Sequence, residues 1–401
     1  MILMASMNET PSGERLHIAF FGKRNAGKSS VINAVTGQNV SIVSDIKGTT
    51  TDPVAKAMEI LPLGPVLLFD TPGFDDEGEL GELRIKRTAQ ILDKSDVAVF
   101  VIDSSAPVSN EELDFINSIR SRNLDYIIVW NKTDLNNKIS AIPNAPNICV
   151  SAKTGCGIEE LKETLKTFAK KKESHPLVSD LLSQGDIVVL VTPIDASAPK
   201  GRLILPQQQV IRDIIDSGAM AYVCQPSTLL RTIQTLNENP RLVITDSQAF
   251  KEVEKTIPSS IPLTSFSILM ARRKGALNES AQGSFKLDEL NDGDKVLISE
   301  GCTHHRQCED IGTVKLPRWI LEYTKKKIDF VFSSGNDFPE DLTPYKMVIH
   351  CGGCMLNERE MKTRVTRAKS QGVAITNYGM AIAYMNGILK RSIEALEGKR
   401  K

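Results

Sequence analysis

A glycine-rich loop between an apolar strand and a helix is the feature that most restricts how this chain folds. The segment Gly22–Ser29 has the sequence GKRNAGKS; it follows the apolar run Ile18–Phe21 and opens a helical pattern. A Walker A phosphate-binding loop requires this context. Its glycines let backbone N–H groups surround phosphates, and the helix N-terminus adds positive potential. The sequence therefore predicts an α/β sheet with a phosphate-binding loop near its N-terminus.

Two segments are predicted to hold the phosphates and their metal ion. Lys28 is expected to contact the β- and γ-phosphates, and the Ser29 hydroxyl to bind Mg²⁺. Asp70-Thr71-Pro72-Gly73 follows a second apolar run, which places Asp70 near the metal through water and the Gly73 amide near a γ-phosphate. We expect the catalytic residues to include Lys28, Asp70 and Gly73. The predicted phosphate-binding residues are Gly22, Asn25, Ala26, Gly27, Lys28, Ser29 and Ser30.

Two later segments select the base. Asn131-Lys132-Thr133-Asp134 follows the apolar run Tyr126–Trp130. The Asp134 carboxylate can accept two hydrogen bonds from guanine N1–H and N2–H₂, and adenine offers no such pair. A backbone N–H of Ser151-Ala152-Lys153 suits guanine O6. The predicted base-binding residues are Asn131, Lys132, Asp134, Ser151, Ala152 and Lys153. Four motifs in this order predict that the chain binds GTP and hydrolyses it.

Composition excludes several other classes of protein. Lys+Arg and Asp+Glu both number 49, so the net charge is zero and no bulk field attracts nucleic acid or lipid. No apolar run approaches the ~18 residues of a membrane helix. The first residues lack the apolar core of a signal peptide. Seven cysteines in such a chain are expected to be reduced thiols or metal ligands, which favours a cytoplasmic protein.

Alternating strand-like and helical patterns divide the chain into three α/β domains. We predict a flexible tail over 1–15, a GTP-binding domain over 16–172, a middle domain over 178–261 and a last domain over 262–401. The two later domains are expected to hold smaller parallel sheets. Their predicted strands, taken as buried in the middle domain, are 186–191, 221–224, 241–245, 295–299, 330–333, 347–350 and 373–377.

Cysteine and histidine cluster in the last domain. Four of the seven cysteines and three of the five histidines lie between Cys302 and Cys354. Cys302 and His304 follow one predicted strand, and His350-Cys351-Gly352-Gly353-Cys354 ends another. Ligands collect at the carboxyl ends of parallel strands, so both segments are expected to meet in one crevice. The sequence therefore predicts a metal site there.

The residues alone leave the nature of this site open. Zinc favours a closed tetrahedral set such as Cys₃His, whereas an iron–sulfur cubane on three thiolates keeps one iron open to another ligand. Buried structural thiols are a further reading. Cys308 is near enough to be a fourth thiolate. The remaining cysteines, Cys149, Cys156 and Cys224, are expected in the protein core.

The nucleotide motifs resemble those of the TrmE–Era–EngA group of GTPases. The shared features are Asn25 in the phosphate loop, Gly48-Thr49-Thr50 before Asp52, and Phe74 at the position of the catalytic glutamine in other GTPases. The resemblance implies a Ras-like G domain in which Thr50 contacts Mg²⁺ and takes part in catalysis. It also implies that K⁺, held partly by Asn25, replaces an arginine finger.

The whole chain resembles the HydF family of [FeFe]-hydrogenase maturation GTPases. The resemblance rests on Cys302-x-His304, on His350-Cys351-x-x-Cys354, and on the middle segment 201–207, GRLILPQ. It implies a [4Fe–4S] cluster on Cys302, Cys351 and Cys354 with an exchangeable fourth ligand. Candidates for that ligand are His304, His350, Cys308, Glu300, Glu309 and Asp310.

Membership of that family would also imply a role and partners. HydF proteins are scaffolds or carriers that receive a diiron precursor from the radical-SAM maturases HydE and HydG. They deliver it to the [FeFe]-hydrogenase apoprotein. Their middle domain forms a homodimer.

Two other functions remain as alternatives. One is an RNA- or ribosome-associated GTPase with a structural zinc site, which a basic last domain would favour. The neutral net charge argues against a large phosphate-binding surface. The other is a redox protein that uses Cys351 and Cys354 as a dithiol, although Cys302 and the histidines favour a metal.

Overall fold

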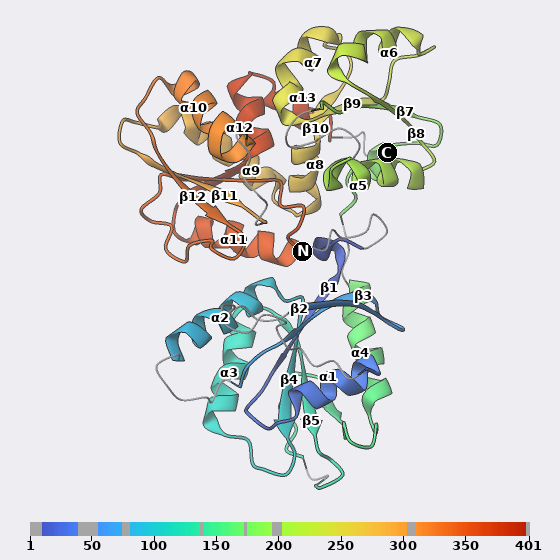
Figure 1. Ribbon diagram of the computed structural model, residues 1–401, viewed down its shortest axis with the longest axis vertical. Helices are drawn as coiled ribbons and strands as arrows, with labels where there is room; N and C mark the ends of the chain where they lie inside the picture. Colours follow the sequence, from blue (N-terminus) through green and yellow to red (C-terminus); the bar gives the residue numbers. More distant parts are fainter. Residues whose placement is uncertain are drawn as a thin grey trace. The chain divides into compact units, whose positions relative to one another are not determined.

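The structure, a computed structural model, describes residues 10–38, 55–73, 81–136, 139–171, 175–194, 203–302 and 310–397; side chains are not described at 81–86 and 170–171. The chain forms two compact units, Met1–Glu173 and Ser174–Lys401. Figure 1 shows helices packed against the sheets in each unit.

The first unit contains one six-stranded sheet in the order β2-β3-β1-β4-β5-β6. Only β2 pairs antiparallel to its neighbour among the described strands. The element bounds are β1 (Leu16–Phe21), α1 (Lys28–Thr36), β2 (Ala55–Ile60), β3 (Gly64–Asp70), α2 (Gly81–Lys94), β4 (Val97–Asp103), α3 (Asn110–Ser121), β5 (Asp125–Asn131), β6 (Asn147–Cys149) and α4 (Ile158–Lys171).

Continuous apolar sequence explains the centre of this sheet. All residues of β1 are buried, as expected for a parallel strand covered on both faces. One core joins the sheet to α1 and α4, and a second core joins the other face to α2 and α3. The α/β fold predicted from the sequence is confirmed. The six-residue β2 and the three-residue β6 are additional strands that the sequence pattern did not indicate.

Residues 10–15 differ from the flexible tail expected over 1–15. Ser12–Glu14 form a 3₁₀ turn, and Arg15 donates hydrogen bonds to the carbonyl oxygens of Thr10 (2.9 Å) and Met58 (3.2 Å). These bonds tie the segment to β2, so it is part of the folded unit. Residues 1–9 lie outside the described ranges.

The second unit contains two four-stranded parallel sheets, in the orders β10-β9-β7-β8 and β12-β11-β13-β14. The predicted pair of smaller parallel sheets is thus confirmed. The element bounds are β7 (Ile187–Val191), α5 (Leu205–Asp216), β8 (Met220–Cys224), α6 (Leu229–Thr235), β9 (Leu242–Thr245), α7 (Phe250–Thr256), β10 (Leu263–Ser265), α8 (Phe266–Arg273), α9 (Leu277–Ser284), β11 (Lys295–Glu300), α10 (Leu316–Thr324), β12 (Asp329–Ser334), β13 (Met347–His350), α11 (Glu358–Ser370), β14 (Ala374–Asn377), α12 (Tyr378–Met385) and α13 (Leu389–Glu394).

One hydrophobic core spans both sheets of this unit. It runs from Leu177 through α8 and α12 to Leu396, so the middle and last domains share buried side chains. β10 belongs to the first of the two sheets, although it follows the predicted boundary at residue 261. Propensity cannot locate such a boundary, because a three-residue strand is defined by its partner β9 rather than by its own sequence.

The edge strand β8 differs from its prediction. Residues 221–224 were expected to be buried, but Met220, Tyr222 and Val223 are 45%, 42% and 48% exposed. β8 pairs only with β7 among the described strands, so it is the edge strand of its sheet. Ala221 and Cys224 are partly buried against the core, whereas Met220, Tyr222 and Val223 leave apolar surface exposed.

Candidate functional site

The phosphate loop joins the end of β1 to the start of α1, and close packing explains its glycines. Gly22 has φ +148°, and a Cβ there would lie 2.3 Å from the carbonyl oxygen of Val101. Gly27 has φ +89°, and a Cβ there would lie 2.3 Å from Nδ2 of Asn131. Any larger residue would have to displace the neighbouring strands or change the loop conformation.

Lys28, Ser29 and Asp70 meet at this loop. Lys28 is buried, and its Nζ donates hydrogen bonds to the carbonyl oxygens of Gly22 (3.0 Å) and Lys23 (2.8 Å). The Ser29 hydroxyl donates to Oδ2 of Asp70 at 2.8 Å. Burial raises the pKa of Asp70, and the Ser29 hydrogen bond and the Lys28 charge oppose that rise.

The other carboxylate oxygen of Asp70 bears on whether these residues could bind Mg²⁺. Oδ1 is buried, and no hydrogen-bond partner lies near it in the described part of the chain. A buried carboxylate oxygen of this kind favours a cation or a cation-bound water. Ser29 and Asp70 therefore fit the predicted Mg²⁺ site. Thr50, the third predicted contact, lies outside the described residues.

The base-binding segment is bonded directly to the phosphate loop. Asn131 donates from Nδ2 to the Ala26 carbonyl oxygen (3.0 Å), and its Oδ1 accepts the Ala152 backbone N–H (3.1 Å). The Ser151 hydroxyl donates to Oδ1 of Asp134 at 2.7 Å, which orients that carboxylate. Hydrogen bonds thus connect the phosphate loop with the segments at Asn131 and Ser151, which are far apart in sequence.

Lys132 has a partner that the sequence did not suggest. Its backbone is left-handed, with φ +66°, and its Nζ lies 2.5 Å from Oδ2 of Asp103 at the end of β4. Burial raises the pKa of Asp103, but hydrogen bonds from Lys132 and Ser105 outweigh it and lower the pKa. The ion pair ties the side chain of Lys132 to the end of β4.

The other predicted nucleotide residues also lie at this edge. Asn25 is exposed, with φ +62°, and Ser30 and Lys153 are exposed as well. Gly73 ends the described range that follows β3. Phe74 lies outside the described residues.

The cysteine segments meet at the carboxyl ends of β11 and β13, as the sequence predicts. Ser299 of β11 pairs with His350 of β13, and the Cys351 backbone N–H donates to the Ser299 carbonyl oxygen at 2.8 Å. Cys302 follows β11 by two residues. The sheet register therefore brings Cys302 to the Cys351–Cys354 turn.

Burial and backbone hydrogen bonds shape this thiol site. Cys351 Sγ accepts N–H groups from Gly301 (3.1 Å) and Gly353 (3.4 Å). Burial, followed by Cys354, raises the pKa of Cys351 to about 12, and these two hydrogen bonds oppose the rise. Burial, with Cys354 next, raises the pKa of Cys302 to about 11. Cys302 and Cys351 are thus both close enough to Cys354 for its charge to raise their pKa values.

The donor atoms of this site can be compared with the ligands of an iron–sulfur cluster. Thiols are the ligand type of such clusters; Cys351 and Cys354 pack against the hydrophobic core, and Cys351 accepts two N–H bonds of the kind made to cluster sulfurs. In the described ranges, which include Cys302, Cys351 and Cys354, no group of three or more His, Cys, Asp or Glu side chains is placed to hold a metal ion. Three candidate fourth ligands, His304, Cys308 and Glu309, lie outside those ranges.

Glu300 and Asp310, two further candidates, are buried beside the thiols. Both carboxylates raise the pKa of Cys302, after burial and Cys354. Tyr378 donates its hydroxyl hydrogen bond to Oε1 of Glu300 at 3.4 Å. Asp310 accepts the Thr313 N–H at 2.9 Å and so caps the helical turn that follows.

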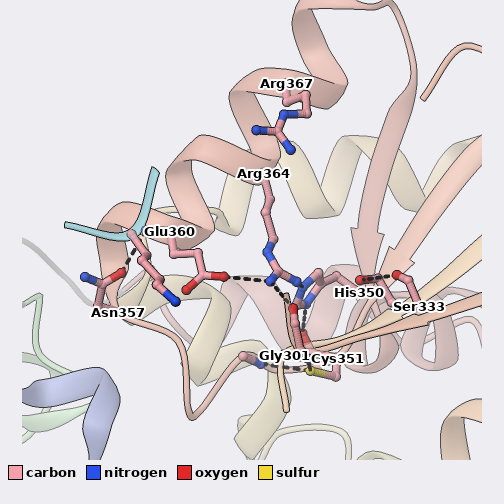
Figure 2. A network of polar contacts seen from close by, with 12 residues as sticks. Gly301, Ser333, His350, Cys351, Asn357, Glu360, Arg364 and Arg367 are labelled. Carbon is pink, nitrogen blue, oxygen red and sulfur yellow. Dashed lines mark hydrogen bonds and ion pairs between the residues drawn. The ribbon is translucent and has the colours of Figure 1, made fainter. Parts of the chain in front are cut away.

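His350 lies in a buried polar network, shown in Figure 2. Its Nδ1 lies 2.8 Å from the Cys351 carbonyl oxygen, and its Nε2 lies 2.9 Å from Nη1 of Arg364. Burial, together with the Arg364 charge, lowers the pKa of His350 to about 3, so the ring is neutral. In this arrangement both ring nitrogens already have hydrogen-bond partners, although the sequence suggested His350 as a possible fourth ligand.

Sequence reasoning missed Asp103 and Arg364 and misplaced two thiols. Asp103 and Arg364 act on residues distant in sequence, and only the i,i+4 spacing of Glu360 and Arg364 could have indicated a buried ion pair. Cys149 and Cys156, expected in the core, are exposed. β6 is an edge strand, so the side of Cys149 opposite the core faces solvent.

Three family models match the chain. Residues 177–275 match the hydrogen maturase F dimerization domain, and residues 278–395 match the hydrogen maturase F tetramerization domain. Together these two matches cover more than half of the chain. Residues 17–132 match a model described as a 50S ribosome-binding GTPase.

Individual relatives resemble the first unit. GTPase Der of Wolinella succinogenes is 32% identical over 206 residues, which cover 43% of each chain. The tRNA modification GTPase MnmE of Aquifex aeolicus is 35% identical over 166 residues, covering 40% of this chain and 36% of the relative. The chain thus spans less than half the length of these curated relatives.

One solved structure resembles part of the chain, and the helices can also be compared with the length of a membrane span. The G domain of the T. maritima FeoB iron transporter is 25% identical, with a TM-score of 0.32, over 39% of this chain and 99% of that one. Among the helices of the described residues, none has the length and apolar character needed to cross a membrane.

Proposed function

Because the chain belongs to the hydrogen maturase F family, we propose that it is a GTP hydrolase and iron–sulfur scaffold for [FeFe]-hydrogenase maturation. The observation that carries the proposal is the presence of two sites in one chain. The first unit brings the phosphate and base motifs together, and the second brings three cysteines to one sheet edge.

In the nucleotide site, Lys28 neutralises phosphate charge while Ser29 and Asp70 hold Mg²⁺. Asp134, oriented by Ser151, selects guanine. Thr50 would supply a further Mg²⁺ contact, and the Gly73 amide would sense the γ-phosphate. Hydrolysis of GTP to GDP and phosphate would be measured by phosphate release. A chain that releases no phosphate from GTP with Mg²⁺ present would contradict the assignment.

We assign K⁺ stimulation to Asn25. Its left-handed backbone lies at the exposed side of the phosphate loop, where a side-chain oxygen can reach a cation beside the phosphates. The GTPase rate is expected to be higher in K⁺ than in Na⁺, and Asn25→Ala is expected to remove the difference. Equal rates in the two salts would exclude a K⁺ role.

In the second unit, Cys302, Cys351 and Cys354 would hold a [4Fe–4S] cluster. When bound, it supplies an open iron position to which a diiron precursor can be attached reversibly. The test is anaerobic reconstitution followed by iron and sulfide analysis. About four irons per chain are expected in wild type and in the control Cys224→Ala, and fewer in Cys302→Ala. One zinc and no iron would instead favour the RNA-associated GTPase.

The proposed partners are HydE and HydG, which supply the diiron precursor, and the [FeFe]-hydrogenase apoprotein, which receives it. GTP binding would alter partner affinity, since switch segments near Thr50 and Gly73 order around a γ-phosphate. Binding to HydG and to the apoprotein would be compared with GDP and with a non-hydrolysable GTP analogue. Identical affinities would exclude this coupling. The free thiols of the described residues suit the cytoplasm.

The exposed strand β8 supports a homodimer through the middle domain. An exposed apolar edge strand such as β8 offers unpaired backbone groups to a second strand, and proteins rarely leave such an edge uncovered. We expect β8 of two copies to pair and cover Met220, Tyr222 and Val223. Val223→Lys should shift the mass measured by light scattering toward the monomer. The control Leu61→Lys, at an exposed turn of the first unit, should leave the mass unchanged.

A further inference from the structure

Arg364 occupies an unusual place beside the cysteine site. It lies on α11, is 4% exposed, and its guanidinium has three polar partners. Nη1 contacts His350 Nε2 at 2.9 Å, while Nη2 donates at 2.6 Å to both the Gly335 carbonyl oxygen and Oε1 of Glu360. The guanidinium also lies 4.9 Å from the Phe338 ring centroid. Figure 2 shows its side chain reaching from the helix to the end of β13.

The chemistry of these partners determines the tautomer of His350. An arginine side chain only donates hydrogen bonds, so His350 Nε2 must be the accepting nitrogen. A carbonyl oxygen only accepts, so Nδ1 must carry the proton that bonds the Cys351 carbonyl oxygen at 2.8 Å. Each bond therefore requires the other, because a neutral imidazole has one donor and one acceptor.

A buried ion pair is costly unless it serves a specific arrangement. Arg364 and Glu360 are only 4% and 13% exposed in their side chains, so both charges lose most of their hydration, and apolar residues of similar size often stabilise a core as well or better. Here the pair is directed at one ring, and that ring contacts the backbone of a predicted cluster ligand. Stability alone therefore gives no reason for this pair, whereas orientation of Cys351 does.

We propose that Arg364 is a positioning residue for the cysteine site, acting through His350 on the Cys351 backbone. By bonding Nε2, it keeps Nδ1–H on the Cys351 carbonyl oxygen and so holds the turn in which Cys351 Sγ accepts the N–H groups of Gly301 and Gly353. His350 then supports the site and is not its fourth ligand. The inference rests on the cluster proposed above.

The experiment uses the full chain with Arg364→Met. A second variant adds Glu360→Gln, because Arg364→Met alone leaves a buried charge that could prevent folding. The matched control is Arg367→Met: Arg367 lies on the same helix and beside the same Phe338 ring (5.9 Å), but its Nη1 donates to the Pro339 carbonyl oxygen at 3.4 Å. ¹⁵N NMR of labelled histidine in the iron-free chain reports the His350 tautomer. Iron loss to a chelator from the reconstituted chain reports cluster retention.

The expected result separates positioning from folding. Wild type and Arg367→Met should show the Nδ1–H tautomer, and the double variant should lose it while keeping its circular dichroism. Iron loss in the double variant should be about tenfold to a hundredfold faster, the usual effect of removing a partner of a metal ligand. An unchanged tautomer or unchanged iron loss would overturn this inference alone. A wild-type chain that binds no iron would overturn the proposed cluster and this inference with it.

Discussion

Asn131 joins the two halves of the nucleotide site, so replacing it should damage both stability and GTP binding. Its side chain is 2% exposed and bonds the Ala26 carbonyl oxygen at 3.0 Å and the Ala152 N–H at 3.1 Å. Asn131→Ala removes both bonds. Losing the partner of a buried polar group costs about 1–3 kcal/mol, so the two losses together should cost roughly 2–6 kcal/mol.

Tryptophan fluorescence can report the unfolding of the first unit alone. Of its two tryptophans, Trp130 is buried in β5 of the first unit, and Trp319 belongs to the second unit. In a Trp319→Phe background, the fluorescence of Trp130 follows urea unfolding of the first unit alone. The free energy of unfolding should fall by the amount given above for Asn131→Ala. The control Asn117→Ala, on the exposed side of α3, should change it by less than about 0.5 kcal/mol.

Nucleotide affinity provides the second readout. The Ala26 and Ala152 backbones belong to the predicted phosphate-binding and base-binding segments respectively, so a loosened Asn131 should weaken binding of a fluorescent GTP analogue as well. A loss of unfolding free energy below about 1 kcal/mol would refute the reasoning, because it is less than one buried hydrogen bond is worth.

Three further predictions follow from the same site. Gly27→Ala should weaken GTP binding, measured by titration, more than the control Gly37→Ala does. Both glycines have positive φ, but of these two only Gly27 has an atom near the added Cβ, Nδ2 of Asn131 at 2.3 Å. Equal effects of the two substitutions would exclude the clash. Asp134→Asn should lower GTP affinity about a hundredfold or more by removing two charge-assisted hydrogen bonds, and should improve binding of xanthosine triphosphate; unchanged GTP affinity would contradict the base assignment. Burial raises the pKa of Asp70, so it takes up a proton at a higher pH than an ordinary aspartate, and Mg²⁺ affinity should fall on acidification at a correspondingly higher pH. Asp70→Asn should bind Mg²⁺ weakly with no such pH dependence, and a wild type without it would refute the assignment.

Local sequence determined much of the nucleotide site. The phosphate loop depends on residue types whose backbone behaviour is intrinsic: Gly22 and Gly27 adopt conformations with positive φ that other residues rarely adopt. The apolar runs before each motif predict buried parallel strands. Since such strands end at one edge of a sheet, the motifs that follow them had to meet there.

The same reasoning placed the cysteines but not their support. Cys302 and Cys351 follow strands that are neighbours in the sheet, so their proximity could be inferred from the sequence. The pairing of His350 with Arg364 could not, because it depends on how α11 packs across β13. A helical arginine with a glutamate one turn earlier is ordinarily a solvated pair.

What the sequence by itself determined is the set of elements, the nucleotide motifs and the edge at which the thiols meet, because these follow from backbone preferences and apolar periodicity. Only the tertiary structure decided burial. It left β8 and Cys149 exposed on edge strands, joined the two later sheets through one core, and buried Arg364 against His350. Apolar or charged character describes a residue, whereas burial depends on which neighbours the completed fold places over it.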